Sequence, residues 1–283
     1  MSDRTQAPTG FARRSRRLSD EETEHRMLHV AVEMVHRTGL TVSLDHLSFE
    51  DIIRAADVSR SAAYRRWPFK DLFFGDLVKE LAQDGRPELV VDEVALMRQV
   101  VAEHPDWLDT AELREHLLQE LFRRLALLDF ETMYASTGWR TYLALHATVM
   151  GLADGELREQ VRAGLAQSER ERTTRVATSW RQLAGLFGYR IRPELGSTFY
   201  ALATLLTATL HGLIIMSLAT PDLATYRAQA RPPGAAETDA WSLVALGVSA
   251  IAATYFEPDS SAWDGDRSAQ VRAALEAWNP PAA

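Results

Sequence analysis

Apolar residues recur at three- and four-residue spacing along most of the chain, and no segment shows the alternation of a half-buried strand. The first stripe predicts a helix over residues 21–37, which Ser19 caps and Gly39 ends. Its apolar positions are Leu28, Ala31, Met34 and Val35. The pattern therefore predicts an all-α protein from its N-terminal part onward.

Two short helices joined by a tight turn are predicted over residues 48–71. Ser48 can cap the first helix, and Ser59 can cap a second one over residues 60–66. Asp57 stands in the turn, where an aspartate tolerates a left-handed backbone better than most residues do. The exposed positions of the second helix carry Arg60, Ser61, Tyr64 and Arg65. Because these side chains can bond phosphates and base edges, the segment predicts a helix-turn-helix whose second helix enters the DNA major groove.

The remaining chain is predicted to form helices that are separated by Gly and Pro residues. A fourth helix over residues 69–83 leads into a larger helical body. The predicted body helices are 89–103, 110–128, 139–152, 155–187, 193–218, 239–255 and 268–278. The predicted organisation is a flexible basic arm (1–18), a helix-turn-helix head (19–84) and a helical body for effector binding and dimerisation (85–283).

The net charge of −8 is unexpected for a DNA-binding protein until it is divided along the chain. Residues 1–80 hold 13 basic and 13 acidic side chains, so the body carries the whole negative excess. The basic side chains near the motif are Arg13, Arg14, Arg16 and Arg17 before the first helix, and Arg54, Arg60, Arg65, Arg66 and Lys70 around the second. Local patches of this kind, rather than the total charge, decide phosphate binding.

The segment VSRSAAYRRWPFKDLF, which starts at Val58, resembles the signature of the tetracycline-repressor (TetR) family of bacterial transcription regulators. The resemblance extends over about residues 18–81 and includes the Trp67-Pro68 step. Asp57 stands where the family usually has Gly, and the link before the motif is longer than usual, which predicts an extra turn at residues 43–45. The resemblance implies a helix-turn-helix head on a helical body that dimerises and holds an effector pocket.

The resemblance also implies roles for individual residues of the motif. The Tyr64 hydroxyl is expected to reach a phosphate, and Lys70 suits a phosphate because helix N-termini attract anions. The candidates for reading bases are Arg60, Ser61, Ala62 and Arg65, with the Ala62 methyl opposite a thymine methyl. The predicted DNA-binding set also contains Ser48, Ser59, Arg13, Arg14, Arg16 and Arg17. The four arginines are either a solvated tail or a minor-groove arm, and their place before the motif favours the arm.

Aromatic side chains gather on the predicted middle helices of the body, where most of them are expected to form core. Since the bodies of the family usually hold a pocket, some are also candidates for lining a mostly apolar effector site. The candidate ligand-binding residues are Phe122, Trp139, Tyr142, His146, Trp180 and His211. Tyr142 or His146 would supply a polar anchor, and His211 could equally lie at a subunit interface.

The sequence offers no basis for an enzyme, a cofactor or a metal site. HExxH, GxSxG, phosphate-loop and GxGxxG patterns do not occur. A polar helix face at metal-ligand spacing carries His25, His29, Glu33 and His36, for which solvent exposure is the stronger interpretation. The chain has no cysteine and its N-terminal segment lacks the apolar core of a signal peptide, so a cytoplasmic location is expected. The apolar run over residues 200–219 is interrupted by three threonines and a histidine and is interpreted as a buried or interface helix, not a membrane span.

Together with these patterns, the resemblance implies a homodimer that binds double-stranded operator DNA, a repressor as is most common in the family, released by a small apolar ligand. The stretches 202–218 and 241–251 are predicted to pair with their copies as a four-helix bundle. Two alternatives remain open. One is a DNA-binding regulator without an effector, and the other is a helical protein that sequesters a ligand, or an enzyme, with a vestigial head.

Overall fold

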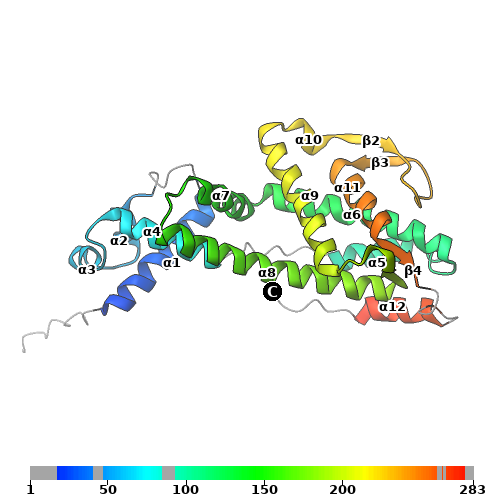
Figure 1. Cartoon of the computed structure of the whole chain (residues 1–283), viewed down its shortest axis with the longest axis horizontal. Helices are drawn as coiled ribbons and strands as arrows, with labels where there is room; N and C mark the ends of the chain where they lie inside the picture. The colour runs from blue at the N-terminus through cyan, green and yellow to red at the C-terminus, as the bar shows by residue number, and fades with distance from the viewer. Residues whose placement is uncertain (1–17, 41–46, 85–92, 260–262, 264–265, 278–283) are drawn as a thin grey trace, which may run out of the picture.

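A computed structural model of the chain describes residues 18–40, 47–84, 93–259, 263 and 266–277. Helices make up most of these residues, in agreement with the predicted all-α class. The molecule is elongated, with α1 to α4 and α7 at one end, α8 running along its length, and the other helices at the far end (Figure 1). The predicted extra turn at residues 43–45 and the predicted boundary between residues 84 and 85 fall wholly or partly outside the described residues.

The head contains α1 (Asp20–Thr38), α2 (Phe49–Ala55), α3 (Arg60–Arg66) and α4 (Lys70–Asp84), close to the predicted bounds. Ser19 caps α1 in a reciprocal pair with Glu22, and Gly39 ends it with φ +83°. The fully buried apolar residues of the head are Met27, Ala31, Val35, Ile52, Ala63, Trp67, Phe73, Leu77 and Ala82. They belong to one hydrophobic core that continues into the body.

The body is built on six longer helices and several short elements. The longer helices are α5 (Glu93–Glu103), α6 (Ala111–Ala135), α7 (Thr137–Gly151), α8 (Glu156–Leu186), α9 (Phe199–Ala219) and α11 (Leu243–Tyr255). The shorter ones are η2 (Pro193–Leu195), α10 (Asp222–Thr225) and α12 (Arg267–Ala277). With 31 residues, α8 runs from its contact with α4 in the head to α9 and β1 at the far end (Figure 1).

The prediction that the chain has no strands is wrong, because two short antiparallel sheets occur. β1 (Tyr189–Ile191) pairs antiparallel with β4 (Phe256–Pro258), and β2 (Arg227–Ala230) with β3 (Asp239–Ser242). Strands of three or four residues are too short to show alternation. The predicted helix over 239–255 starts later, after the cap Ser242, because β3 occupies its first residues. The predicted helix over 193–218 also starts later, after the cap Thr198, because its first residues form the separate 3-10 turn η2.

Two body helices contact the head. α7 packs against α1 and α4, and α8 packs along α4. The backbone N–H of Leu40 donates to Oγ1 of Thr141 at 3.2 Å, which ties the end of the first helix to α7. A change in the positions of α7 and α8 would therefore be transmitted to the head.

Candidate nucleic-acid interface

The turn between α2 and α3 has the geometry that the sequence predicts. The Oγ of Ser48 accepts the N–H of Asp51 at 3.3 Å, and the Oγ of Ser59 accepts the N–H of Ala62 at 3.2 Å. Asp57 has φ +52°, the left-handed conformation that the prediction assigns to it. The two serine hydroxyls therefore act as helix caps, and both residues remain exposed.

The inner side of α3 is fixed by small apolar residues. Val58, Ala62 and Ala63 are buried, and α3 packs against α1. Ala62 has only 7% of its surface exposed, so its methyl group packs into the head. This placement differs from the expected contact with a thymine methyl, because α3 packs against α1 with the side that carries position 62, while positions 60, 61, 64 and 65 face outward.

The outer side of α3 carries the other four candidates, and three of them are held by carboxylates. Arg60 Nη2 and the Tyr64 hydroxyl both donate to Oε1 of Glu50, at 2.6 Å and 3.0 Å. Arg65 donates to Oδ1 of Asp20 through Nε at 2.9 Å and Nη2 at 2.5 Å. The hydrogen bond from Arg60, opposed by desolvation, lowers the pKa of Glu50. In the absence of DNA, acidic side chains of α1 and α2 thus occupy the groups expected to contact DNA.

Trp67 packs in the core and sets the direction of the chain after α3. Its ring is fully buried at 5.0 Å from that of Phe73, and its Nε1 donates to Oδ2 of Asp76 at 2.9 Å. Lys70 follows as the first residue of α4 and is exposed. The end of α3 and the start of α4 therefore place Tyr64 and Lys70 close to each other in the chain and both in solvent.

The predicted arm residues Arg13, Arg14, Arg16 and Arg17 lie outside the described residues. Glu50 and Asp20 were not predicted as partners of the basic face. These carboxylates are 10 and 45 residues from the arginines that they bind, beyond the reach of helical spacing rules. The equal numbers of acidic and basic side chains in residues 1–80 were the available signal.

Four of the six predicted ligand-binding residues meet in the body at the junction of α7, α8 and α9. We call this group the junction cluster, with members Trp139, Tyr142, His146, Glu169, Arg172 and His211. The carboxylate of Glu169 accepts hydrogen bonds from Tyr142 and Arg172 and lies 3.3 Å from Nε2 of His146. Arg172 Nη1 lies 3.4 Å from Nε2 of His211, so this nitrogen accepts and the imidazole is neutral.

Burial and charge shift the pKa values of the junction cluster in opposite directions. Burial opposes ionisation of Glu169, but the bonds from His146, Tyr142 and Arg172 outweigh it and lower its pKa to about 2. The bond to Glu169 raises the pKa of His146. Burial, then the charge of Arg172, lower the pKa of His211 to about 4. The cluster is thus a compact ion-pair network with a neutral histidine at one edge.

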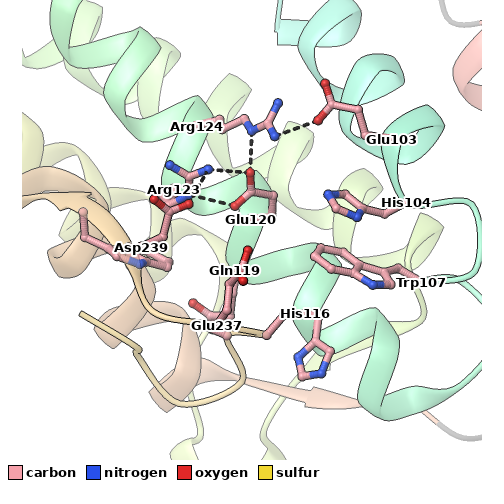
Figure 2. A pocket seen from close by; sticks show the side chains of 13 residues that line it. Glu103, His104, Trp107, His116, Gln119, Glu120, Arg123, Arg124, Glu237 and Asp239 are labelled. Carbon is pink, nitrogen blue, oxygen red and sulfur yellow. Dashed lines mark hydrogen bonds and ion pairs between the residues drawn. The ribbon is translucent and has the colours of Figure 1, made fainter. Parts of the chain in front are cut away.

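Phe122 and Trp180 lie apart from this cluster, with ring centroids 5.7 Å from each other, and Trp180 reaches Phe256 at 6.1 Å. The structure therefore does not bring the six predicted residues together. A cavity of about 260 Å³ lies elsewhere, between α5, α6 and the β2–β3 hairpin, and none of the six lines it (Figure 2).

Two solved structures are similar to this chain. A candidate TetR-family transcriptional regulator from Mesorhizobium loti is 16% identical, with a TM-score of 0.42, over 84% of this chain and 98% of that one. A TetR-family transcriptional regulator from Agrobacterium tumefaciens is 15% identical, with a TM-score of 0.38, over 82% of this chain and 95% of that one. No protein-family model and no curated protein sequence matches the chain.

Proposed function

We propose that this protein is a dimeric, sequence-specific DNA-binding regulator of transcription that acts in the cytoplasm. The observation that carries the proposal is the capped helix-turn-helix, whose α3 turns Arg60, Ser61, Tyr64 and Arg65 to solvent immediately before Lys70. In this role, α3 enters the major groove, and Arg60, Ser61 and Arg65 read base edges. Tyr64 and Lys70 bind phosphates, which position the head without selecting sequence.

Replacing Lys70 with alanine should weaken binding to every duplex by a similar factor. One phosphate contact is lost, so the slope of log affinity against log salt should fall by about one unit. The measurement is fluorescence anisotropy with an operator-like and an unrelated duplex at several salt concentrations. Lys79→Ala is the matched control, because Lys79 lies on the same helix, is the other lysine of the chain and pairs with Asp76.

A change in duplex preference with an unaltered salt slope for Lys70→Ala would contradict the phosphate assignment. An equal change in slope for the Lys79 variant would show that the effect comes from total charge. Thermal unfolding of both variants separates these results from damage to the head.

Replacing Glu50 with glutamine should strengthen DNA binding severalfold for all duplexes. The carboxylate binds Arg60 and Tyr64 and must release both before they reach DNA. The amide removes the charge that competes with phosphate while keeping the size of the side chain. Glu80→Gln, at an exposed position of α4, serves as the control. Weaker binding of the Glu50 variant would mean that this carboxylate orients Arg60 for DNA instead of withholding it.

The proposed dimer uses the solvent-facing side of α9 and α11. On α9, the exposed large apolar residues are Tyr200, Leu205, Ile215, Met216 and Leu218. At 100° per residue they lie on one half of the helix, with Ala208 and Gly212 between them. Ala250 and Ala253 are exposed on α11, which packs beside α9. A second copy of the same face would bury these groups across a two-fold axis.

Two features refine the predicted interface. Leu206 and Ala245, which lie within the predicted stretches, are buried and face the core of their own chain.

The composition and length of α9 would also allow it to cross a membrane, and 28% of its most apolar window is buried. Since α9 packs on α8 and α11 within the body, we favour a partner chain as the cover for its exposed side.

Release of DNA by a ligand belongs to the same proposal, as a repressor mechanism. A ligand changes the spacing of the two heads only if it binds one spacing more tightly than the other. The contacts of α7 and α8 with α1 and α4 support such a coupling. A regulator without an effector is the second candidate, favoured by the deep burial of Phe122, Trp139 and Tyr142, which pack as core.

A further inference from the structure

The cavity of about 260 Å³ has a wall that depends on one glycine. Nδ1 of His116 lies 2.8 Å from the carbonyl oxygen of Gly234, at the tip of the β2–β3 hairpin. Gly234 has φ +82°, and a Cβ atom there would lie 2.5 Å from Cγ of Glu115. Glycine therefore allows the hairpin tip to approach α6. Because the carbonyl oxygen can only accept, Nδ1 of His116 donates this hydrogen bond.

A ladder of alternating charges runs along one side of the cavity (Figure 2). Arg123 Nη2 lies 3.0 Å from Oδ2 of Asp239 and 2.7 Å from Oε1 of Glu120. Arg124 continues the ladder, with Nε 2.5 Å from Oε1 of Glu120 and Nη2 2.7 Å from Oε2 of Glu103. Three carboxylates thus face two guanidinium groups, and the ladder keeps one negative charge in excess.

Glu237 adds a fourth carboxylate to the lining. It is exposed, and no ion pair joins it to another described residue. Four carboxylates and two guanidinium groups line the cavity, so these groups together give its wall a charge of −2. An anion would have to displace carboxylates that already hold both arginines, whereas a cation gains attraction without breaking any pair.

Aromatic rings and unused donors complete the lining. Trp107 stacks on His104 with ring centroids 3.6 Å apart, and Trp241 forms another part of the wall. Such rings attract organic cations through their faces. Gln119 is buried, and its side-chain carbonyl oxygen accepts a hydrogen bond from the hydroxyl of Ser249 at 2.6 Å. This bond leaves the amide N–H groups of Gln119 as donors. The indole N–H of Trp241 also has no acceptor among the described residues.

We propose that this cavity binds a small organic cation, namely an amine on an aromatic or apolar body with one acceptor oxygen. The ammonium group lies by Glu237 and Asp239, the body lies against Trp107 and Trp241, and the oxygen accepts from Gln119. The volume suits a ligand smaller than most drug-sized molecules, whose sites measure roughly 300–1,000 Å³. Binding of a cation in this cavity does not require that the head binds DNA.

Calorimetric titration with three phenols of the same body tests the charge preference. Tyramine ends in an ammonium group, para-ethylphenol in a methyl group and phloretate in a carboxylate. We expect tyramine to bind about tenfold more tightly than para-ethylphenol, and phloretate to bind most weakly, from the charge of the wall. Equal affinities, tighter binding of phloretate, or no heat from tyramine at millimolar concentration would overturn the proposal.

The variant Glu237→Gln tests the placement of the ammonium group. It should reduce tyramine affinity to near that of para-ethylphenol, and it should leave para-ethylphenol unchanged. Since Glu237 is exposed, the fold should be retained, which a melting curve checks. Glu80→Gln is the matched control and should change neither affinity. An unchanged tyramine affinity in the Glu237 variant, or an equal loss in the Glu80 variant, would overturn the assignment of this cavity.

Discussion

Replacing Ile215 with glutamate should turn the proposed dimer into monomers and weaken operator binding on the order of a hundredfold. Ile215 is 53% exposed in the single chain and lies at the centre of the α9 face proposed to meet its copy. In a two-fold interface the substitution occurs twice, and each buried unpaired carboxylate costs several kcal/mol. A monomer holds one head and so loses the simultaneous contact with two half-sites.

Sedimentation velocity measures the assembly, and binding to a palindromic duplex measures the loss of affinity. Met150→Glu is the control, because Met150 is an exposed apolar residue at the end of α7 and lies outside the proposed interface. An unchanged sedimentation coefficient for the Ile215 variant would place the interface on another surface. Monomers that keep full operator affinity would show that dimerisation is not needed for DNA binding.

Replacing Glu169 with alanine should lower the free energy of unfolding by about 3 kcal/mol. Arg172, with 7% of its surface exposed, would lose its carboxylate partner while remaining buried, and removing one member of a buried pair costs about 3–5 kcal/mol. We expect a cost at the lower end of this range because the side chain of Glu169 is 32% exposed. Tyr142 and His146 would lose their acceptor as well.

Urea unfolding at several pH values measures the loss of stability and its dependence on the charge of Glu169. Burial opposes ionisation, but the bonds from His146, Tyr142 and Arg172 lower the folded-state pKa of Glu169 to about 2, from its ordinary value of 4.5. The stabilisation linked to this shift is therefore present above pH 4.5 and lost as the pH falls toward 2. The gap between wild type and Glu169→Ala should shrink over the same range. Glu171→Ala, two residues away on the exposed side of α8, should cost far less at every pH. A cost below 1 kcal/mol for Glu169→Ala would mean that water replaces the carboxylate around Arg172.

The junction cluster joins α7, α8 and α9, and two of these helices also contact the head. It therefore links the helix of the proposed dimer interface to the helices that position α1 and α4. We expect changes in the cluster to alter the distance between the two heads as well as the stability. This consequence follows from placement in the fold, since Tyr142, Glu169 and His211 come from three separate helices.

Features that depend on near neighbours in the chain could be predicted from the amino-acid pattern. Ser48 and Ser59 cap helices through N–H groups three residues ahead, and Asp57 adopts the left-handed turn within a single residue. The apolar stripe of α1 has the period of one helix, so its buried face could be read directly. These signals are local, and hence the helix-turn-helix was predicted almost to the residue.

Packing between helices determines which side chains meet, and no local pattern specified those contacts. Periodicity assigns position 62 to a helix, but the contact with α1 decides that Ala62 is buried and Arg60 is free to bind Glu50. Aromatic positions of the body were predicted correctly as mostly core, yet the cavity lies where α5, α6 and a hairpin tip converge. A helical pattern fixes the side on which a residue lies, while its partner depends on the packing angle and register of helices distant in the chain. For that reason the charge ladder of the cavity and the carboxylates that bind α3 emerged from the structure alone.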